Sequence, residues 1–427
     1  MTRKRKRSIL LSTGFLCVMV VVAGILRYVW IFPIHPWETL QQYLDSYVYS
    51  DMLAHWVTAQ KYWAPGAQWG YADLMYPPGT GAFLALVFGP HMDRLGLFLF
   101  VQWLQTMWIF LGAGYLAFLL YGRRVGMIAL FIAALSFPLF DYGVYVLSET
   151  PFTSLLLAGA VFMVLAVRRK RYQYFLLAGI FFGLSATMKS IGLVVGVLLL
   201  PVFFLPHCWR EKRRVRMAFA SLLCAGLLLV VVPVSMLMTV RNHGEFMLFA
   251  HDVNRMALVN HGNLRDVYLA LPEGGYYMNG APTSYQKGFF ERRDIDLQKD
   301  NIIAQNIRWV LDHPFHAFTS YLERTADYVY GTLPFPTCCN GFRPLSYFSG
   351  LMLLLFIFVP AAAWAMRARE RFSRKECLLS LIILLPLASL PLVAIVSVTE
   401  PRYLHPFVPF LIVFASAWYE KKLTKSK

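Results

Sequence analysis

The sequence predicts an all-α polytopic membrane protein with about ten transmembrane helices and both termini in the cytoplasm. Three observations predict this fold: the composition, the length of the apolar runs and the placement of Lys and Arg. Of the 427 residues, 58% are hydrophobic and 15% are charged, whereas about 25% of the residues in a soluble domain are charged. The composition excludes a soluble enzyme and a disordered chain, and it disfavours a nucleic-acid binder despite the net charge of +17.

The first predicted span covers residues 8–32, which are apolar except for Arg27 and follow a basic cluster at residues 3–7. The apolar core of a signal peptide is only about 7 to 15 residues long and ends at a small-residue cleavage site. Neither feature is present, so we expect an uncleaved span with its N-terminus inside the cell.

Nine further apolar runs have lengths close to the roughly 17 to 25 residues that a membrane helix requires. The two that flank Lys189 are somewhat short, and we expect them to be broken or tilted. The runs lie at residues 95–121, 125–145, 150–167, 172–187, 190–206, 217–240, 346–366, 377–397 and 404–419.

The positions of the basic residues support this topology. The predicted cytoplasmic segments hold 25 of the 40 Lys and Arg residues but only 4 of the 23 acidic residues, a net charge of +21, which leaves −4 for the rest of the chain. Excess Lys and Arg mark cytoplasmic loops. The high charge is therefore mainly a topology signal, with contact to anionic membrane lipids as a secondary effect.

We expect a single membrane-embedded domain over residues 1–427, with two segments on the extracytoplasmic face. These are a first loop at 33–96 and a larger loop at 241–343, both rich in aromatic residues and Pro. Their pattern is typical of juxtamembrane helices that lie on the bilayer surface.

The first loop carries the densest group of polar and aromatic side chains. If residues 37–63 form one helix, Asp45, Tyr49 and Trp56 fall within 40° of one another around its axis, and Asp51 can hydrogen-bond His55 one turn later. One interpretation is an amphipathic surface helix with solvated acids. The other is a carboxylate that accepts a proton beside rings that stack on a sugar.

Several short motifs, taken in order, resemble the C-type glycosyltransferase superfamily, which includes protein O-mannosyltransferases and the lipid A aminoarabinose transferase. After the first apolar span the chain reads Asp-Ser-Tyr-Val-Tyr, then Tyr-Pro-Pro, Leu-Ser-Glu-Thr-Pro, Thr-Met-Lys, Arg-Asn-His-Gly and Pro-Arg-Tyr-Leu-His-Pro; these motifs begin at positions 45, 76, 147, 187, 241 and 401. The resemblance covers about residues 30–415.

The resemblance implies a membrane enzyme that transfers a sugar from a polyprenyl-phosphate carrier to an acceptor on the outer face, usually with inversion at the anomeric carbon. It implies catalytic roles for Asp45 and Glu149, with Asp141 as a weaker candidate for the second acid. It also implies that Arg402 faces the carrier phosphate.

The substrate-binding candidates complete this expected site. Many relatives have Lys where this chain has Tyr76, so the resemblance leaves Lys189, Arg241 or His405 as further candidates to contact phosphate. Together with Arg402, the substrate-binding set is Tyr49, Asp51, His55, Tyr76, Lys189, Arg241 and His405.

The expected partners are the lipid-linked sugar, membrane lipids and a protein, lipid or glycan acceptor, with no nucleic acid. No cofactor is required by the sequence, although a divalent metal held by Asp45, Asp51 or Glu149 remains an alternative. The absence of an Asn-x-Ser/Thr sequon favours a bacterial inner membrane. A transporter or lipid flippase without covalent chemistry is the alternative function, although transporters more often place polar groups at the middle of the membrane.

Overall fold

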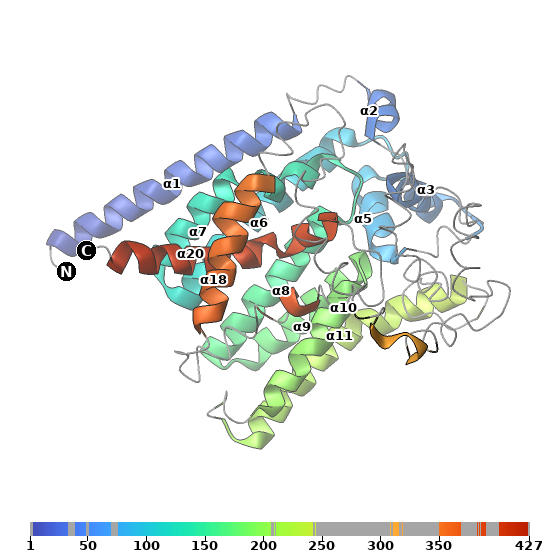
Figure 1. The fold of residues 1–427 in the computed structure, drawn as a ribbon. Coiled ribbons are helices and arrows are strands. Elements are labelled where there is room, and N and C mark those ends of the chain that lie inside the picture. The colour runs from blue at the N-terminus through green and yellow to red at the C-terminus, as the bar shows by residue number, and fades with distance from the viewer. Residues whose placement is uncertain are drawn as a thin grey trace.

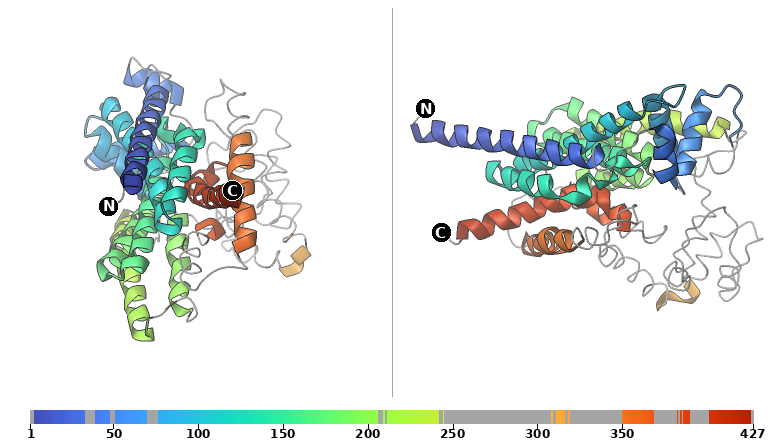
Figure 2. Two further views of the ribbon diagram at one scale, coloured as in Figure 1. Left: turned by 90° about the vertical axis from the view of Figure 1, so that its left-hand side faces the viewer. Right: turned by 90° about the horizontal axis from the view of Figure 1, so that it is seen from above.

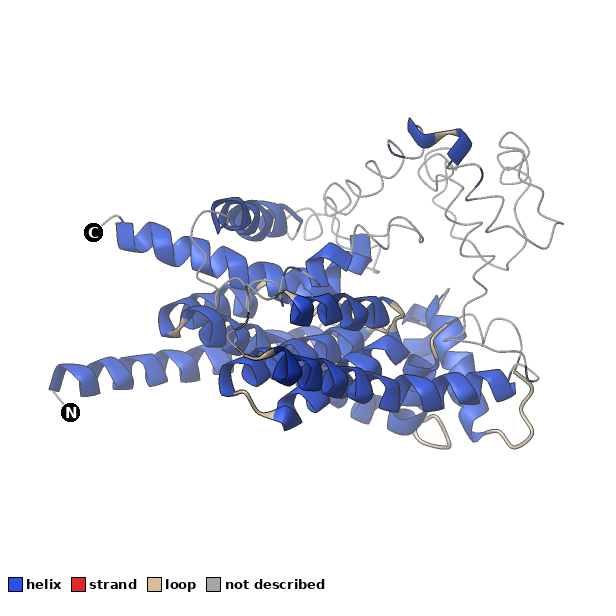
Figure 3. Cartoon of the chain, turned by 90° about the horizontal axis from the view of Figure 1, so that it is seen from below, coloured by secondary structure: helices blue, strands red, loops and turns tan. Residues whose placement is uncertain are grey.

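The computed structural model describes residues 3–32, 39–47, 51–69, 76–205, 209, 211–241, 244, 308, 311–315, 318, 350–368, 382, 384, 386–389 and 401–425. Every regular element in these ranges is a helix, as the secondary-structure colouring of Figure 3 shows. The prediction of an all-α chain is confirmed for this part of the sequence.

The helices form one bundle with shorter helices at one end (Figure 1). The α-helices are α1 (Arg3–Ile31), α2 (Leu40–Tyr47), α3 (Asp51–Trp63), α5 (Pro78–Phe88), α6 (Leu95–Tyr121), α7 (Arg123–Leu135), α8 (Glu149–Arg169), α9 (Tyr172–Met188), α10 (Ile191–Leu199), α11 (Arg213–Arg241), α18 (Val359–Ala368) and α20 (Val408–Lys425). Short 3-10 helices are η1 (Phe137–Leu139), η2 (Asp141–Val144), η3 (Leu200–Phe204) and η6 (Pro401–Phe407), and η5 (Leu354–Phe358) is a π-helical turn before α18.

Helix α8 is the central helix and is buried over nearly its whole length. Its first turn contains Glu149 and Pro151, and its last turn contains Arg168 and Arg169. An acid at the N-terminus and bases at the C-terminus both favour the helix dipole, and Pro is tolerated in a first turn. Lys170 ends the helix with a left-handed φ of 53°. At 1.5 Å per residue, α8 is about 30 Å long, which matches the hydrocarbon thickness of a bilayer.

Small residues allow the helices around α8 to approach closely. A Cβ at Gly179 of α9 would lie 3.0 Å from the Cα of Gly226 in α11, and one at Gly159 of α8 would lie 2.8 Å from the ring of Phe182. Such contacts stabilise helix pairs in membranes, where there is little hydrophobic driving force between helices. Each of these glycines therefore sets a helix separation that alanine would not permit.

One end of the bundle, which we call the basic end, collects residues that the sequence predicts to be cytoplasmic. Arg124 Nη1 lies 3.9 Å from Glu420 Oε1, and Lys170 Nζ lies 2.5 Å from Glu211 Oε1. Arg168 Nη2 donates to the carbonyl of Leu120 at 3.4 Å. Both ends of the chain lie on this side (Figure 2).

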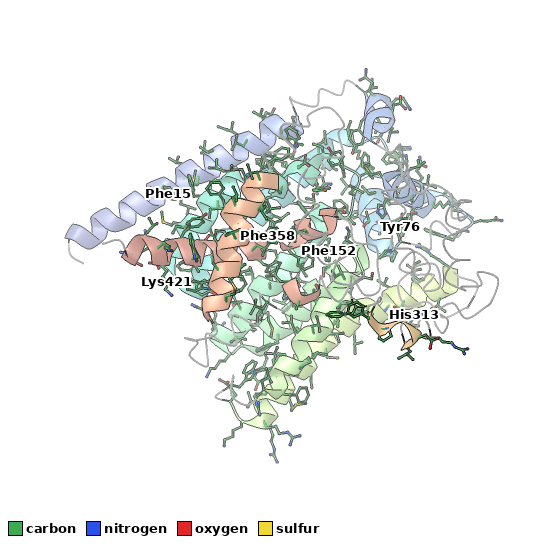
Figure 4. The ribbon with its side chains drawn as sticks, viewed as in Figure 1. Phe15, Tyr76, Phe152, His313, Phe358 and Lys421 are labelled. Atoms are coloured by element: carbon green, nitrogen blue, oxygen red, sulfur yellow. The ribbon has the colours of Figure 1, made fainter. Side chains whose placement is uncertain are left out.

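The opposite end, which we call the site end, collects residues predicted to be extracytoplasmic. Helix α8 begins there at Glu149, and the turn between α9 and α10 and the helix η6 lie beside it. In Figure 4, Tyr76 at this end and Lys421 near the basic end lie on opposite sides of the molecule. The described residues thus sort into two ends as the charge distribution predicts.

Four helices in the described residues are long and apolar enough to cross a membrane: Gly14–Ile31, Leu95–Tyr121, Glu149–Arg169 and Arg213–Arg241. The predicted run 125–145 is not one straight span, because α7 and the segment Phe137–Val144 meet at an angle of 84°. The two runs flanking Lys189 form a hairpin, in which Gly192 of α10 approaches Ser185 and Ala186 of α9. Most of run 377–397 lies outside the described residues.

The prediction of one face shared along residues 37–63 is wrong. Helices α2 and α3 are separate (Figure 1), and Asp45 is exposed whereas Met52 and Trp56 are buried. The ring of Trp56 packs edge-on against Phe88 of α5, with centroids 4.8 Å apart. Apolar burial against α5, which pattern reasoning could not foresee, therefore sets the orientation of α3. Most of the predicted loop 241–343 lies outside the described residues.

Candidate active site

The centre of the candidate site is an ion pair between two buried helix ends. Lys189 Nζ donates to Glu149 Oε1 at 2.6 Å, and the two side chains are 17% and 1% exposed. Glu149 opens α8, and Lys189 lies in the turn between α9 and α10. Because a buried charge is costly without a partner, each residue stabilises the other in this position. The structure thus brings two residues that the sequence predicts as site candidates into direct contact.

His405 extends this centre from the other end of the sequence. Its Nδ1 lies 3.3 Å from Thr153 Oγ1, and Thr153 also donates to the carbonyl of Glu149 at 2.6 Å. The ring of Tyr142 lies edge-on to the imidazole, with centroids 4.7 Å apart. His405 is fully buried. Helix η6 is thus fixed against the start of α8, and three sequence-distant segments meet around one acid.

The Tyr-Pro-Pro turn packs directly on the Thr-Met-Lys break. A Cβ at Gly79 would lie 2.6 Å from the carbonyl oxygen of Thr187, and Thr80 Oγ1 lies 3.8 Å from Met188 Sδ. Only glycine permits this approach without displacement of the backbone. The contact places the first outer loop next to Lys189.

The rings of Tyr76 and His55 contact each other in a tilted arrangement at the edge of this turn. Their ring centroids lie 4.9 Å apart with an interplanar angle of 59°. His55 is buried in α3, and Tyr76 is half-buried. These two substrate-binding candidates therefore contact each other.

Arg241 is the last residue of α11, and its guanidinium packs against two aromatic rings at the site end. Its guanidinium carbon lies 3.6 Å from the centroid of Trp69 and 4.5 Å from that of Tyr62. Tyr62 in turn donates to the carbonyl of Pro78 at 3.2 Å. Arg241 Nη1 is buried and has no hydrogen-bond partner in the described part of the chain. A stacked guanidinium with a free edge suits an anion.

Asp45 lies apart from the buried centre. Its carboxylate is exposed on α2 and accepts a hydrogen bond of 2.7 Å from Gln41 Nε2. The neighbouring Tyr43 anchors the helix, because its hydroxyl donates to the carbonyl of Val144 at 3.0 Å. Helix α2 is therefore held at the site end with Asp45 open to solvent.

Three site candidates are not described at side-chain level. Tyr49 lies outside the described residues, and only the backbone of Asp51 and Arg402 is described, at the start of α3 and in η6 respectively. Their predicted roles stay predictions. The weaker candidate Asp141 is fully buried in η2, and neither of its carboxylate oxygens has a hydrogen-bond partner in the described structure.

Of the three residues expected as ligands of a divalent metal, the structure describes the side chains of Asp45 and Glu149 and only the backbone of Asp51. The described ranges contain no group of three or more His, Cys, Asp or Glu side chains arranged to hold a metal ion. Glu149 instead contacts the Lys189 ammonium, which repels a cation. We therefore assign no step to a metal.

Sequence reasoning missed Thr153 and Tyr142, which hold His405. Thr153 was open to detection, because it lies four residues after Glu149 and residues with that spacing share a helix face. Tyr142 carried no periodic signal, because it lies in a 3-10 segment within a run that reads as one continuous span.

Part of the sequence matches a known family model. Residues 76–236 match the model described as dolichyl-phosphate-mannose-protein mannosyltransferase. The matched range includes Tyr76, Glu149 and Lys189, all three of which lie at the site end. No curated protein sequence matches the chain significantly.

Solved structures share the fold at low sequence identity. The archaeal oligosaccharyltransferase AglB from Archaeoglobus fulgidus, in complex with an inhibitory peptide and a dolichol-phosphate, is similar with a TM-score of 0.53 and 14% identity, over 96% of this chain and 50% of that one. An Archaeoglobus fulgidus oligosaccharyltransferase in complex with zinc and sulfate is similar with a TM-score of 0.54 and 14% identity, over 95% of this chain and 49% of that one.

ArnT from Cupriavidus metallidurans is similar in the apo state with a TM-score of 0.55 and 16% identity, over 97% of this chain and 62% of that one. ArnT bound to undecaprenyl phosphate gives a TM-score of 0.50 with 16% identity, over 96% of this chain and 60% of that one. The chain thus spans about half the length of AglB and about three fifths of ArnT. In a stretch of its sequence and in its fold, this chain resembles the C-type glycosyltransferase superfamily.

Proposed function

We propose that this protein is a membrane glycosyltransferase that moves a sugar from a polyprenyl-phosphate carrier to an acceptor at the extracytoplasmic face. The observation that carries the proposal is the meeting of the Tyr76 turn, Glu149 and Lys189 at the site end, within the range that matches the mannosyltransferase model. The carriers in the AglB and ArnT structures support a lipid-phosphate donor.

The reaction needs a proton acceptor and a group that balances the phosphate. The acceptor oxygen forms a bond to the anomeric carbon, the bond from that carbon to the phosphate oxygen breaks, and the acceptor loses its proton. Asp45 takes the proton as general base, because it is the exposed carboxylate on α2 and can meet an acceptor that arrives from solvent. Attack opposite the leaving phosphate inverts the anomeric centre.

Arg241 is better suited than Lys189 to the carrier phosphate. Glu149 at 2.6 Å neutralises Lys189, so an incoming anion meets a neutral pair. Arg241 has no carboxylate partner in the described residues, and the edge of its guanidinium at Nη1 is without a hydrogen bond there. Arg402, in the short helix that holds His405, is the second phosphate contact that we propose.

The Glu149 and Lys189 pair then serves to assemble the site. It ties the start of α8 to the turn on which the Tyr76 segment rests, and His405 is held to the same helix start through Thr153. His55 and Tyr76 offer aromatic surface at the edge of this turn for the apolar face of a sugar.

The test is the lipid-linked sugar that accumulates in cells lacking the protein. Wild-type protein should consume that lipid when its gene is restored. Asp45→Asn keeps the side-chain volume but cannot accept a proton, so turnover should fall at least about a hundredfold at normal expression. Asp93→Asn, which alters an exposed acid in the same first loop, is the matched control and should behave as wild type.

Two results would overturn the proposal. The first is a cell lacking the protein in which no polyprenyl-phosphate sugar accumulates. The second is Asp45→Asn protein that consumes the lipid at the wild-type rate, which would move the base to another residue and reopen the transporter alternative.

A further inference from the structure

Arg27 is a cation buried within the first span. It lies near the end of α1, its exposed fraction is 0%, and the described part of the chain places no carboxylate in ion-pair contact with it. A buried charge of this kind in a membrane helix is costly and indicates a use. The proposed mechanism gives it none.

The Arg27 side chain is directed at the broken end of α7. Its Nη2 donates to the carbonyl of Ala133 at 3.1 Å, and its Nη1 lies 3.4 Å from the carbonyl of Ala134. A third bond, from Nη1 to the carbonyl of Ala23, returns to its own helix at 3.2 Å. The guanidinium of Arg27 in α1 thus lies across the C-terminal end of α7 and contacts its last carbonyl groups.

The sequence explains why this helix end needs a donor. In a continued α-helix the carbonyl of Ala134 would accept from the N–H of residue 138, but that residue is Pro138 and has no N–H. Helix α7 therefore ends at Leu135, and the chain turns by 84° into the 3-10 segments. Because a bilayer core holds no water, an unpaired carbonyl there is costly.

Two aromatic rings complete the Arg27 environment. The guanidinium carbon lies 5.2 Å from the centroid of Phe110 and 4.9 Å from that of Phe140. Cation–π contact with these faces partly replaces the missing hydration. Phe140 follows Pro138 in the chain, whereas Ala133 and Ala134 precede it, so Arg27 contacts the chain on both sides of the bend.

We propose that Arg27 is a positioning residue: it caps the end of α7 and fixes the bent segment 136–148, which leads directly into Glu149. The segment carries Tyr142, which packs on His405, and Val144, which anchors α2 through Tyr43. One cap in the first span thereby sets the position of both the buried acid and the helix that carries Asp45. This role deepens the proposed function, and its effect on activity rests on that function.

Hydrogen exchange tests the cap without any assumption about activity. In the bent segment the amides of Leu139, Phe140, Gly143 and Tyr145 are each bonded within one 3-10 turn. In purified Arg27→Met protein we expect these amides to exchange at least about tenfold faster than in wild type, because the anchor of the segment is lost. Arg27→Lys keeps the charge but not the planar fork, and should give an intermediate rate.

The matched control is Trp103→Phe. Trp103 Nε1 donates to the carbonyl of Gly24 at 3.3 Å, so this variant removes another contact between α1 and the bundle but leaves the α7 end untouched. Its exchange in the bent segment should equal that of wild type. Unchanged exchange in both Arg27 variants would overturn the proposal, and so would equal acceleration in Trp103→Phe.

The activity arm uses consumption of the accumulated lipid-linked sugar by the same variants. Arg27→Met should lose turnover more than about tenfold with normal expression, and Arg27→Lys should recover part of it. If the Arg27 variants exchange faster but the wild-type protein itself consumes no lipid-linked sugar, the cap is retained and only the proposed function is refuted. Faster exchange with full turnover would refute the positioning role.

Discussion

Lys189 Nζ lies 2.6 Å from Glu149 Oε1, although 40 residues separate the two in the sequence. The pair joins the N-terminus of the central helix to the turn between α9 and α10, and both side chains are largely shielded from solvent. In such surroundings the loss of either partner leaves an uncompensated charge. This relationship sets the first prediction.

We expect the two single variants Glu149→Gln and Lys189→Met to be strongly destabilised, by roughly 3 kcal/mol each, and the double variant to recover part of that loss. Thermal unfolding of the four purified proteins in detergent measures the coupling. The control is Glu211→Gln, which removes the half-exposed pair with Lys170 and should cost less than about 1 kcal/mol. Additive losses in the double variant would show that the pair is not coupled.

Gly79→Ala should damage the site by overpacking. The new Cβ would lie 2.6 Å from the carbonyl oxygen and 2.7 Å from the carbonyl carbon of Thr187, and backbone atoms cannot rotate away. We expect a loss of about 1 to 3 kcal/mol in stability and a larger loss of turnover. Gly96→Ala, where a Cβ meets nothing within 4 Å, is the control. Equal behaviour of the two variants in thermal unfolding and turnover would contradict the packing argument.

The topology can be checked by labelling single cysteines with a membrane-impermeant reagent in a background without the six native Cys. Position 279 should react in intact cells, whereas position 213 should react only after the cells are opened. The reason is the net charge of +21 on the segments predicted to be cytoplasmic. Two basic residues of these segments, Arg124 and Lys170, lie with their acidic partners at the basic end. Labelling of 213 but not 279 in intact cells would reverse the orientation.

The sequence predicts the features that depend on many residues at once, namely the helical fold and the two ends of the bundle. Ten runs of apolar residues and one charge gradient predict an all-helical bundle, and the described structure sorts Arg124 and Glu149 to opposite ends as expected. Each such prediction rests on many residues, so a single misread position does little harm. The count of ten spans stays a prediction, because parts of the C-terminal third lie outside the described residues.

Individual contacts were harder to predict, because they depend on a few tertiary relationships. The face that the sequence assigns to Asp45 and Trp56 together was wrong, since burial of Trp56 against Phe88 sets the orientation of α3. The bend after Leu135 depends on Pro138 together with Arg27, which lies more than 100 residues away. Periodicity carries no information about a donor from another helix.

The last prediction concerns Arg241 and the carrier phosphate. Because its guanidinium is stacked on Trp69 with Nη1 unbonded in the described structure, Arg241→Gln should weaken binding of a short synthetic polyprenyl phosphate by at least about tenfold. A charge-assisted hydrogen bond contributes about 1.5 to 3 kcal/mol, which corresponds to that range of affinity. Titration of the purified variants in nanodiscs with the sugar-free carrier measures this without knowledge of the sugar or the acceptor.

Two further variants separate binding of the phosphate from packing of the stack. Trp69→Phe keeps an aromatic face and should bind the carrier within about threefold of wild type, whereas Trp69→Ala releases the guanidinium and should weaken binding to nearly the same extent as Arg241→Gln. Arg169→Gln is the control. The guanidinium carbon of Arg169 lies 6.0 Å from the ring centroid of Tyr174 at the basic end, at the opposite end of α8 from the site. Unaltered carrier binding in Arg241→Gln would transfer the phosphate contact to Arg402, and equal weakening in Arg169→Gln would show that the titration reports charge alone.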